Sequence, residues 1–427
     1  MRIHPRVEAR RGAGGGEAAY QGILDEAHAA MSAKLETTFR GDTGQLERRI
    51  SMREKLTAAY FERERERIFR RAWLPIGHAS HLPEPGSYFV RELPVLKTSL
   101  LVVRGQDGKV RAFHNACTHR GNKLVRSGAG CRKSFSCGFH GWTFSSEGEL
   151  KLVTDEHQFR DLDKGALGLR PIHTQVWEDL VFVNGADAPG ESLREWLGEM
   201  FDEYGGYFEQ HERVASLRIN VNSNWNLAVN SFTEGYHTLY LHRNSVPDYQ
   251  GGKINPDRHR PFMQLFKRHH RYSAPANPDH RLTPAEALVI KYGKRIIPAF
   301  GGEMPALPPG VNPSRYEHWA FDVVQLYPNA VFLFGNNWHI ELFFGPIDVD
   351  HTEVVQDLYY YRPKNAGERL SHQFFLSRGR QVFLEDMNTL EAQHAVLSSG
   401  ILSHLQLSQQ EMSLMHHYKV SREMLDE

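Results

Sequence analysis

The cysteines of this chain are gathered in one short, glycine-rich stretch. All three cysteines of the 427 residues lie between Cys117 and Trp142, in CTHRGNKLVRSGAGCRKSFSCGFHGW. One residue separates Cys117 from His119, two separate Cys137 from His140, and seventeen lie between the two pairs. Two thiols and two imidazoles in two tight local pairs can converge on one metal site at little cost in loop entropy. This pattern constrains the fold more than any other feature of the sequence.

Three interpretations of the Cys/His pattern compete. A structural zinc ion accepts two cysteines and two histidines, but zinc fingers usually place the cysteines in one pair and the histidines in the other. Mixed pairs match the Rieske type of [2Fe-2S] cluster, in which two histidines replace two cysteines on one iron. If the two cysteines and two histidines were core residues that bind no metal, the spacing of all four would be a coincidence. We therefore predict a Rieske cluster, and we expect Cys131, which fits neither pair, to be a small core residue or an unconnected thiol.

Composition limits the partners that the chain can have. Lys plus Arg and Asp plus Glu number 51 each, so no long-range field attracts nucleic acid or an anionic membrane. So few cysteines favour a reducing compartment, and we expect a cytoplasmic protein. A glycine run follows the twin arginine at Arg10 and Arg11, where a signal peptide would need an apolar stretch. No run of eighteen apolar residues predicts a membrane span.

Changes in the pattern of polar, apolar and turn-forming residues divide the chain into four parts, and together these parts predict an α+β protein. Residues 1–52 are polar and predict an arm, and residues 53–74 predict an amphipathic helix that packs with the larger domain. Residues 75–187 contain short apolar runs separated by Gly, Pro and Asp-Gly turns, which predict a small antiparallel β domain around the Cys/His stretch. Residues 188–427 mix strand and helix patterns and predict a second domain with an antiparallel sheet and helices. Within them, residues 250–315 lack periodicity, and we expect a long, partly ordered excursion.

A second metal pattern lies in the larger domain. The stretch NWNLAVNSFTEGYHTLYLH contains Glu234, His237 and His242. Two histidines and a carboxylate form the facial triad of non-haem Fe(II) sites, which leaves positions open for O₂ and substrate. Residues five apart on a regular helix are separated by about 140°, so the two histidines require a helix end or a π-type widening between them. Asn230, Glu234 and His237 would share one face of such a helix.

Together the two patterns resemble the Rieske non-haem iron oxygenases, in particular the α (terminal oxygenase) subunits of aromatic-ring-hydroxylating dioxygenases. CTHRG and CGFHGW are similar to the two cluster loops of that family, and NWNLAVNSFTEGYHTLYLH is similar to its iron segment. The resemblance covers roughly residues 55–420. It implies that Arg120 and Trp142 flank the cluster, that His237 and His242 bind the mononuclear iron, and that Asn230 lies beside it.

The resemblance also implies the remaining residues of the iron site. The third iron ligand comes from a C-terminal carboxylate, and in QVFLEDMNTLEAQ we choose Asp386, with Glu385 as its competitor. Glu234 takes the place of a bridging acid, usually Asp, that links an iron-binding histidine to the second cluster histidine of a neighbouring protomer. That histidine is His140 here. A ring of such contacts implies a homotrimer, alone or with a second (β) subunit.

The implied function is that of a terminal oxygenase. Electrons from NAD(P)H would arrive through a separate reductase or ferredoxin, because the chain has no nucleotide-binding fingerprint and no second cysteine set. Apolar stretches such as FLFGNNW and ELFF suit a pocket for a small hydrophobic, aromatic substrate, and they equally suit strands that simply face the core. Dihydroxylation, monohydroxylation and oxidative demethylation all remain open. The alternative is a Rieske electron-transfer protein without oxygenase activity.

Overall fold

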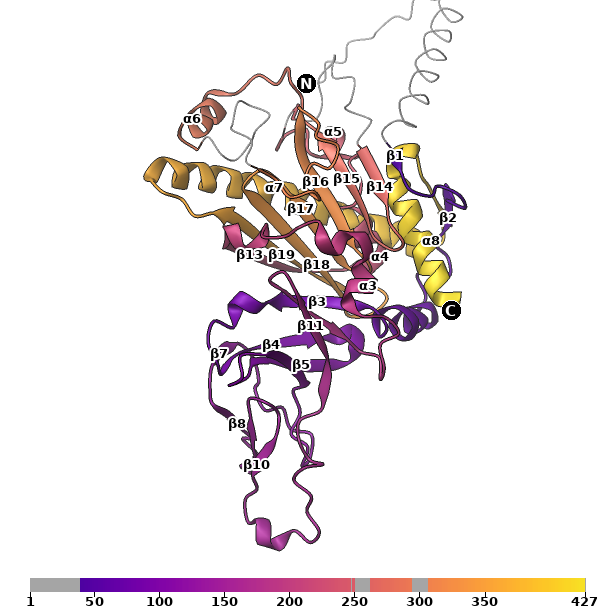
Figure 1. The fold of residues 1–427 in the computed structure, drawn as a ribbon. Coiled ribbons are helices and arrows are strands. Elements are labelled where there is room, and N and C mark those ends of the chain that lie inside the picture. Colours follow the sequence, from indigo (N-terminus) through magenta and orange to yellow (C-terminus); the bar gives the residue numbers. More distant parts are fainter. Residues whose placement is uncertain (1–38, 247, 250–261, 294–305, 427) are drawn as a thin grey trace, which may run out of the picture.

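The computed structural model describes residues 39–246, 248–249, 262–293 and 306–426. Two parts are stacked along the long dimension of the molecule, a β-rich part below and a larger sheet with helices above (Figure 1). This is the α+β architecture expected from the sequence. Most of the predicted arm, residues 1–38, lies outside the described residues. The predicted domain boundaries stay predictions.

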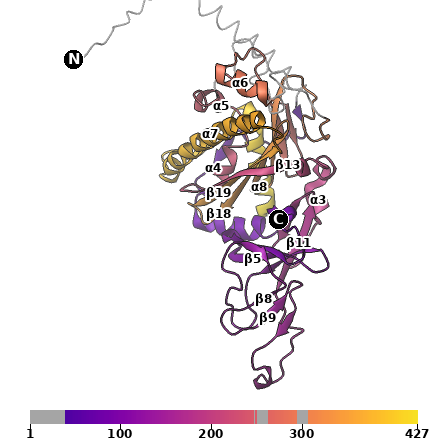
Figure 2. The same ribbon diagram turned by 90° about the vertical axis from the view of Figure 1, so that its left-hand side faces the viewer.

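The lower part is built on a seven-stranded sheet in the order β3-β12-β11-β6-β5-β4-β7. A three-stranded sheet, β10-β9-β8, lies beyond it, towards the lower end of the molecule (Figure 2). Short apolar runs between turns therefore form an antiparallel domain, as the pattern predicts. The strands are β3 (Trp73–His78), β4 (Ser87–Leu93), β5 (Thr98–Arg104), β6 (Val110–His114), β7 (Ala129–Cys131), β8 (Ser134–Ser136), β9 (Thr143–Ser145), β10 (Leu150–Leu152), β11 (Pro171–Trp177) and β12 (Leu180–Asn184).

The upper part is built on an eight-stranded sheet in the order β1-β14-β15-β16-β17-β18-β19-β13. Neighbouring strands are antiparallel except β1 and β14, which are parallel. Such a sheet buries one face under helices. The strands are β1 (Phe39–Arg40), β13 (His211–Val221), β14 (Phe262–Leu265), β15 (His270–Pro275), β16 (Trp319–Leu326), β17 (Ala330–Phe334), β18 (Trp338–Pro346) and β19 (Thr352–Tyr361).

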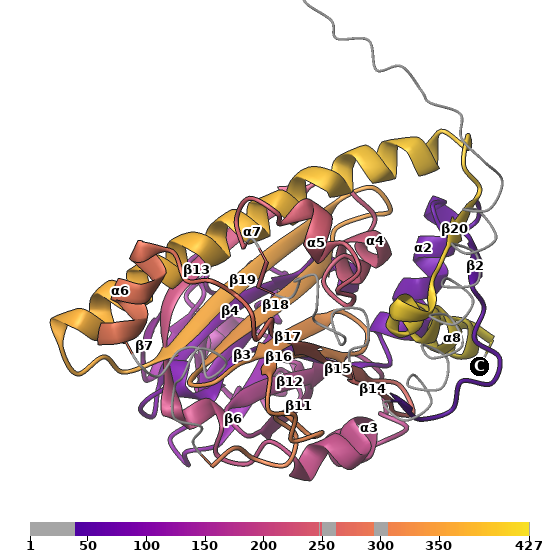
Figure 3. The same ribbon diagram turned by 90° about the horizontal axis from the view of Figure 1, so that it is seen from above.

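A long helix, α7 (Ala366–Ser398), lies across the upper sheet, and Figure 3 shows it from above. It begins at the N-cap Asn365, whose side chain accepts the N–H of Glu368, a common helix start. Among the described residues, no helix combines the length and apolar character needed to cross a bilayer. The other helices are α2 (Ala58–Glu64), α3 (Leu193–Leu197), α4 (Trp225–Asn230), α5 (Thr238–Leu241), α6 (Pro284–Tyr292) and α8 (Met412–Asp426), and a small sheet pairs β2 (Arg49–Ser51) with β20 (His404–Gln406).

Two expectations about regular structure need correction. The amphipathic helix predicted for residues 53–74 is shorter, because α2 passes into a π-helical turn at Arg65–Phe69 before β3 begins. The excursion predicted for residues 250–315 contains β14, β15 and α6 in its described parts. The sequence does not show the usual strand pattern here, because a charged residue occupies a buried position. Arg271 of β15 is 3% exposed and donates hydrogen bonds to Glu203 and Gln264.

Strand β5 shows how the two parts share a core. Its side chains alternate between the faces of the sheet. Leu100 and Val102 belong to the large core that continues into the upper domain, whereas Leu101 and Val103 pack with the residues of the Cys/His loops. All four are fully buried. The lower sheet therefore holds the Cys/His loops on one face and the upper domain on the other.

A buried polar contact ties the two parts together. His78 of β3 is 3% exposed, and its Nδ1 lies 2.8 Å from Asp179 and its Nε2 2.8 Å from Glu341 of β18. Burial acts to lower the pKa of His78, but the charge of Glu341 and the bonds to both carboxylates outweigh it and raise the pKa to about 10. Burial acts to raise the pKa of Glu341, and the contacts with His78 and His339 instead lower it to about 2. The junction therefore holds an ion pair.

Candidate metal centres and active-site cavity

Two matching turns carry the cysteines of the Cys/His pattern. In one, the Gly121 N–H donates to the Cys117 carbonyl at 2.8 Å, and in the other the Gly141 N–H donates to the Cys137 carbonyl at 2.9 Å. Both glycines have a positive φ, of 78° and 76°, a backbone conformation that other residues rarely adopt. The glycines therefore allow both turns to close tightly, and the turns place the two cysteines side by side in one buried cluster.

The two cysteine thiols suit metal ligands. Cys117 and Cys137 are 2% and 3% exposed. Burial acts to raise the pKa of Cys137, but backbone N–H groups and the amide of Asn122, whose Nδ2 lies 3.6 Å from Sγ, outweigh it and lower the pKa. Such donors stabilise a thiolate. Cys131, by contrast, is exposed in β7 and unpaired, so of the two roles expected for it the core role is wrong.

The two histidines of the pattern lie beside each other. The rings of His119 and His140 are 4.7 Å apart between centroids, and Trp142 stacks on His119 at 4.7 Å with the planes 13° apart. Trp142 is 2% exposed and shields one side of the group. The guanidinium of Arg120 lies over the exposed ring of Phe139 at 5.4 Å. A pair of buried thiols and a pair of adjacent imidazoles on the same two turns fit a Rieske cluster.

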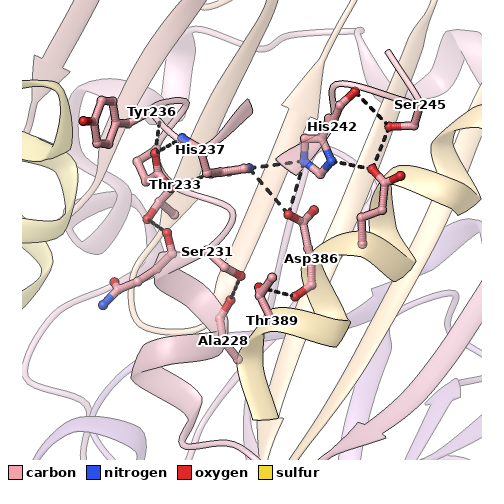
Figure 4. Close-up of polar contacts among 12 residues, drawn as sticks. Ala228, Ser231, Thr233, Tyr236, His237, His242, Ser245, Asp386 and Thr389 are labelled. Carbon is pink, nitrogen blue, oxygen red and sulfur yellow. Dashed lines mark hydrogen bonds and ion pairs between the residues drawn. The ribbon is translucent and has the colours of Figure 1, made fainter. Parts of the chain in front are cut away.

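A second group of ligands gathers between α5 and α7, on the face of the upper sheet that α7 covers. His237 Nε2 and His242 Nε2 lie 3.2 Å apart, and Asp386 Oδ1 of α7 lies 3.5 Å from the first and 3.2 Å from the second (Figure 4). The ligand atoms of these three residues all lie within 4.8 Å of one another. Asp386 is 3% exposed and Oδ1 makes no hydrogen bond of acceptable geometry. A buried, unbonded carboxylate oxygen facing two imidazole nitrogens fits a shared cation.

The backbone around these histidines differs from the expected helix. α4 ends at Asn230, a turn follows, and α5 occupies only the four residues between His237 and His242. The carboxylate of Glu234 accepts the N–H groups of Tyr236 and His237, which lets the turn replace helical hydrogen bonds. Asn230, Glu234 and His237 therefore do not share one helix face. Helix ends beside both histidines allow their rings to meet.

Glu385, the competitor of Asp386 in the sequence, has a different position. Its Oε2 lies 2.8 Å from His242 Nδ1 and accepts the hydroxyl of Ser245 at 2.7 Å. It thus contacts the ring nitrogen of His242 that faces away from Asp386. A metal-binding histidine commonly donates its second N–H to such a carboxylate, which fixes the ring. The pairing of Glu385 and Ser245 with His242 was missed from the sequence, where only the adjacent acids Glu385 and Asp386 gave a signal.

Glu234 and Asn230 lie on the outer side of the histidine group. Glu234 Oε1 contacts His237 Nδ1, the ring nitrogen that faces away from His242. Asn230 donates through Nδ2 to the Tyr418 hydroxyl of α8 at 2.7 Å, and its Oδ1 is buried without a partner. Both residues line a hollow on the surface that His237 also lines. The hollow offers a way for another molecule to approach Glu234.

The carboxylates around the histidine group favour the protonated form of its imidazoles. Burial acts to lower the pKa of His237, but its contacts with Glu234 and Asp386 outweigh it and raise the pKa to about 9. Burial also acts to lower the pKa of His242, but the nearby carboxylate of Asp386 outweighs it and raises the pKa. Burial raises the pKa of Asp386. A cation of charge two would take the place of the protons on the imidazoles.

An apolar cavity of about 240 Å³ opens on the other side of the group. His237, His242 and Asp386 stand at one end of it, and its walls come from the upper sheet and from α7. The walls are largely aliphatic and aromatic, and the apolar members include Phe232, Val323, Leu333, Ile340, Phe375 and Phe383. The volume lies just below the usual range for ligand pockets, which suits a small molecule.

Comparison with known proteins places both parts of the chain. The family profile of the ring hydroxylating alpha subunit (catalytic domain) matches residues 208–427, and the Rieske [2Fe-2S] domain profile matches residues 72–166. The chain is 35% identical over 198 residues to the large oxygenase component of the naphthalene 1,2-dioxygenase system of Pseudomonas aeruginosa, covering 44% of this chain and 42% of that protein. It is 28% identical over 180 residues to the carnitine monooxygenase oxygenase subunit of Acinetobacter baumannii, covering 42% and 48%.

These alignments span about half the length of the curated relatives. The fold is similar to that of a quaternary ammonium Rieske monooxygenase, with a TM-score of 0.69 and 19% identity over 87% of this chain and 94% of that one. At this identity the likeness shows the fold alone. The two family profiles imply a Rieske cluster and a mononuclear iron as cofactors. Because the catalytic-domain profile covers half of the sequence, the chain belongs to the ring-hydroxylating α-subunit family, with an N-terminal Rieske domain.

Proposed function

We propose that the chain is the terminal oxygenase component of a multicomponent Rieske oxygenase. It would use O₂ and electrons from NAD(P)H, delivered by a reductase or ferredoxin, to oxidise a small hydrophobic, aromatic compound. The observation that carries the proposal is the convergence of His237, His242 and Asp386 at the end of an apolar cavity. An electron-transfer protein without oxygenase activity would have no use for that convergence.

We assign the iron ligands to these three residues. The bound iron would supply O₂ activation, and the three ligands leave coordination positions open towards the cavity. Glu385 would hold His242 through Nδ1, and Ser245 would hold Glu385. The apolar walls would exclude water and orient the substrate against the open side of the site.

We assign the cluster to Cys117, His119, Cys137 and His140. The cluster would supply single electrons, and the protein's part is to hold it at an exposed tip. Trp142 would cover the His119 side, and Arg120 and Phe139 would form the surface near His140. Phe139 is 57% exposed, which suits contact with another protein surface.

We further propose that electrons pass between neighbouring copies of the chain. The cluster turns belong to the lower part of the molecule, and the histidine group, beside α5 and α7, belongs to the upper part (Figure 1). The hollow beside Glu234 is rimmed by Tyr240, which is 71% exposed. A neighbour's exposed tip docking there would bring its His140 to Glu234, with Asn230 beside them. Identical head-to-tail contacts of this kind close into a homotrimer, with or without a β subunit.

The product is proposed only as one of three classes, and the location rests on composition. Aromatic-compound catabolism is the setting that the apolar cavity favours, and the product is a cis-dihydrodiol, a monohydroxylated compound or a demethylated one. The cytoplasm is the proposed location, because the chain has few cysteines.

A substrate-dependent consumption of NADH and O₂ with a surrogate reductase, coupled to a hydroxylated product, tests the function. Electron flow without any oxygenated product across an aromatic, alicyclic and quaternary-amine panel would contradict it.

A further inference from the structure

A buried glutamine without a hydrogen bond lines the cavity. Gln356 of β19 is 3% exposed and belongs to the cavity wall. Its Oε1 is buried with no partner, and neither atom of its amide bonds any described residue. A buried amide without a partner is costly, and such groups in native proteins usually have a reason. The position within an otherwise apolar wall points to a ligand.

The alternation of β19 turns Gln356 towards the cavity. Leu342, its cross-strand neighbour on β18, lines the cavity as well. The next residue, Asp357, points to the opposite face, where it pairs with Arg213 at 3.4 Å. Successive side chains of a strand point to opposite faces of the sheet, so the outward position of Asp357 is the one expected if Gln356 faces the cavity. The amide is therefore held on the cavity side by the register of the sheet.

The packing of α7 on β19 locates Gln356 along the cavity. The two elements run in opposite directions: Leu358 lies beside Gly379, and Tyr360 packs on His372 with ring centroids 4.9 Å apart. Gln356 precedes Leu358 on β19, so it lies towards the part of α7 that follows Gly379, and that part carries Asp386. The amide therefore lies on the side of the cavity wall towards the metal ligands.

The charges in the cavity limit what the amide can recognise. Of the described lining residues, Arg378 alone carries a permanent positive charge. Its guanidinium is paired with Glu286 at 2.5 Å and also contacts the Tyr249 hydroxyl. Burial acts to raise the pKa of Glu286, but its bonds, with Arg378 first, lower it to about 2 and keep it ionised. Away from the metal ligands, the described lining residues therefore offer an anionic substrate group no unpaired cation, and a neutral polar group fits better.

We propose that Gln356 is a specificity-determining residue that hydrogen-bonds a neutral polar group, such as a hydroxyl, carbonyl or N–H, on the ring skeleton of the substrate. This rests on the proposed function and narrows its substrate class to ring compounds with such a substituent, as opposed to bare hydrocarbons. An amide both donates and accepts, so either kind of group satisfies it. The bond would also fix which ring carbon is turned towards the metal ligands.

The test compares matched ligands on the oxidised holoenzyme, where no turnover occurs. Calorimetric affinities are measured for the pairs indane and 1-indanone, and naphthalene and 1-naphthol. The Gln356→Leu variant should weaken binding of the polar member about tenfold and leave binding of the hydrocarbon equal or tighter. Its substrate-free thermal midpoint should not fall, since an unpartnered buried amide is removed. Leu342→Met is the control and should shift both members of a pair by the same factor.

The outcomes separate this inference from the function on which it rests. If the wild type binds both members of a pair and Gln356→Leu leaves their affinity ratio unchanged, the role of Gln356 is overturned and the oxygenase proposal stands. If the wild type binds neither member of any pair, the cavity is not the substrate site, and the proposed function and the inference fall together. A tenfold loss confined to the polar members supports the inference.

Discussion

His242 Nδ1 lies 2.8 Å from Glu385 Oε2, on the side of the imidazole ring that faces away from Asp386. Two adjacent acids of α7 thus contact opposite nitrogens of one ring. Asp386 is placed to bind a metal together with His242, and Glu385 is placed to orient the ring. The tautomer of His242, and hence its lone pair at Nε2, follows from this arrangement.

Replacing Glu385 tests its orienting role. Glu385→Ala should weaken Fe(II) binding about 10- to 100-fold, because the second nitrogen of His242 loses its acceptor. Titration of metal-depleted protein with Fe(II) under anaerobic conditions measures this. The matched control is Gln381→Ala, one turn earlier on α7, whose amide contacts only the other oxygen of Glu385 at 3.3 Å. Equal affinities for all three proteins would contradict the role of Glu385.

Removing a proposed iron ligand should separate the two metal centres. His237→Ala should abolish oxygenation and retain the visible spectrum of the cluster, because the cluster loops lie in the other part of the molecule. Absorption and EPR spectra of the purified variant, with product analysis, check this. His351→Ala is the control, since His351 is exposed and contacts only Asp348 among the carboxylates of the described residues. Loss of the cluster spectrum in His237→Ala would count against the assignment.

Glu234 should matter for electron transfer more than for metal binding. Glu234→Gln removes the negative charge next to His237 and should slow transfer from cluster to iron at least about tenfold, with the cluster spectrum and iron content unchanged. Rapid mixing of the reduced protein with O₂ and substrate gives the single-turnover rate. Glu234→Asp, which keeps the charge, should retain more of the rate than Glu234→Gln. An unchanged rate in Glu234→Gln would remove the bridging role.

The pair of His78 and Glu341 predicts how stability varies with pH. The folded pKa of His78, about 10, lies above its ordinary 6.5, so its contribution is complete below about pH 6.5 and is lost as the pH rises through 10. The folded pKa of Glu341, about 2, lies below its ordinary 4.5, so its contribution is complete above about pH 4.5 and is lost as the pH falls through 2. The thermal midpoint of the wild type should exceed that of His78→Gln most between about pH 4.5 and 6.5.

His81 supplies the control for this pH dependence. Its ring lies 5.2 Å from that of His78, and burial lowers its pKa to about 4, so it is neutral over the alkaline range. The difference in midpoint between wild type and His81→Gln should therefore stay constant from pH 6.5 to 10, whereas the difference for His78→Gln should shrink. A difference for His78→Gln that grows over that range would refute the ion pair.

The parts of this protein that sequence could predict are the local ones. The pairs Cys117/His119 and Cys137/His140 each lie within one turn, so their spacing alone indicated a metal site. The small β domain followed from short apolar runs between turns, and the α+β class is confirmed. The family resemblance is confirmed by the matching profiles.

The parts that sequence could not predict depend on tertiary packing. Adjacent residues on a helix point about 100° apart, so only the placement of α7 against α5 decides which of Glu385 and Asp386 faces both histidines. The turn between α4 and α5 forms because Glu234 bonds local N–H groups, which a helical pattern does not reveal. Likewise, the alternation of β19 could not say which face of the strand lines a cavity, and Gln356 passed unnoticed.

The count of iron and sulfide per chain tests the central claim most directly. Purified, fully loaded protein should contain about three iron ions and two acid-labile sulfides, the sum of a Rieske cluster and a mononuclear site. The His237→Ala variant should contain about two irons and two sulfides. About two irons in the wild type, unchanged in the variant and after Fe(II) loading, would contradict an iron site at His237, His242 and Asp386 and leave an electron carrier.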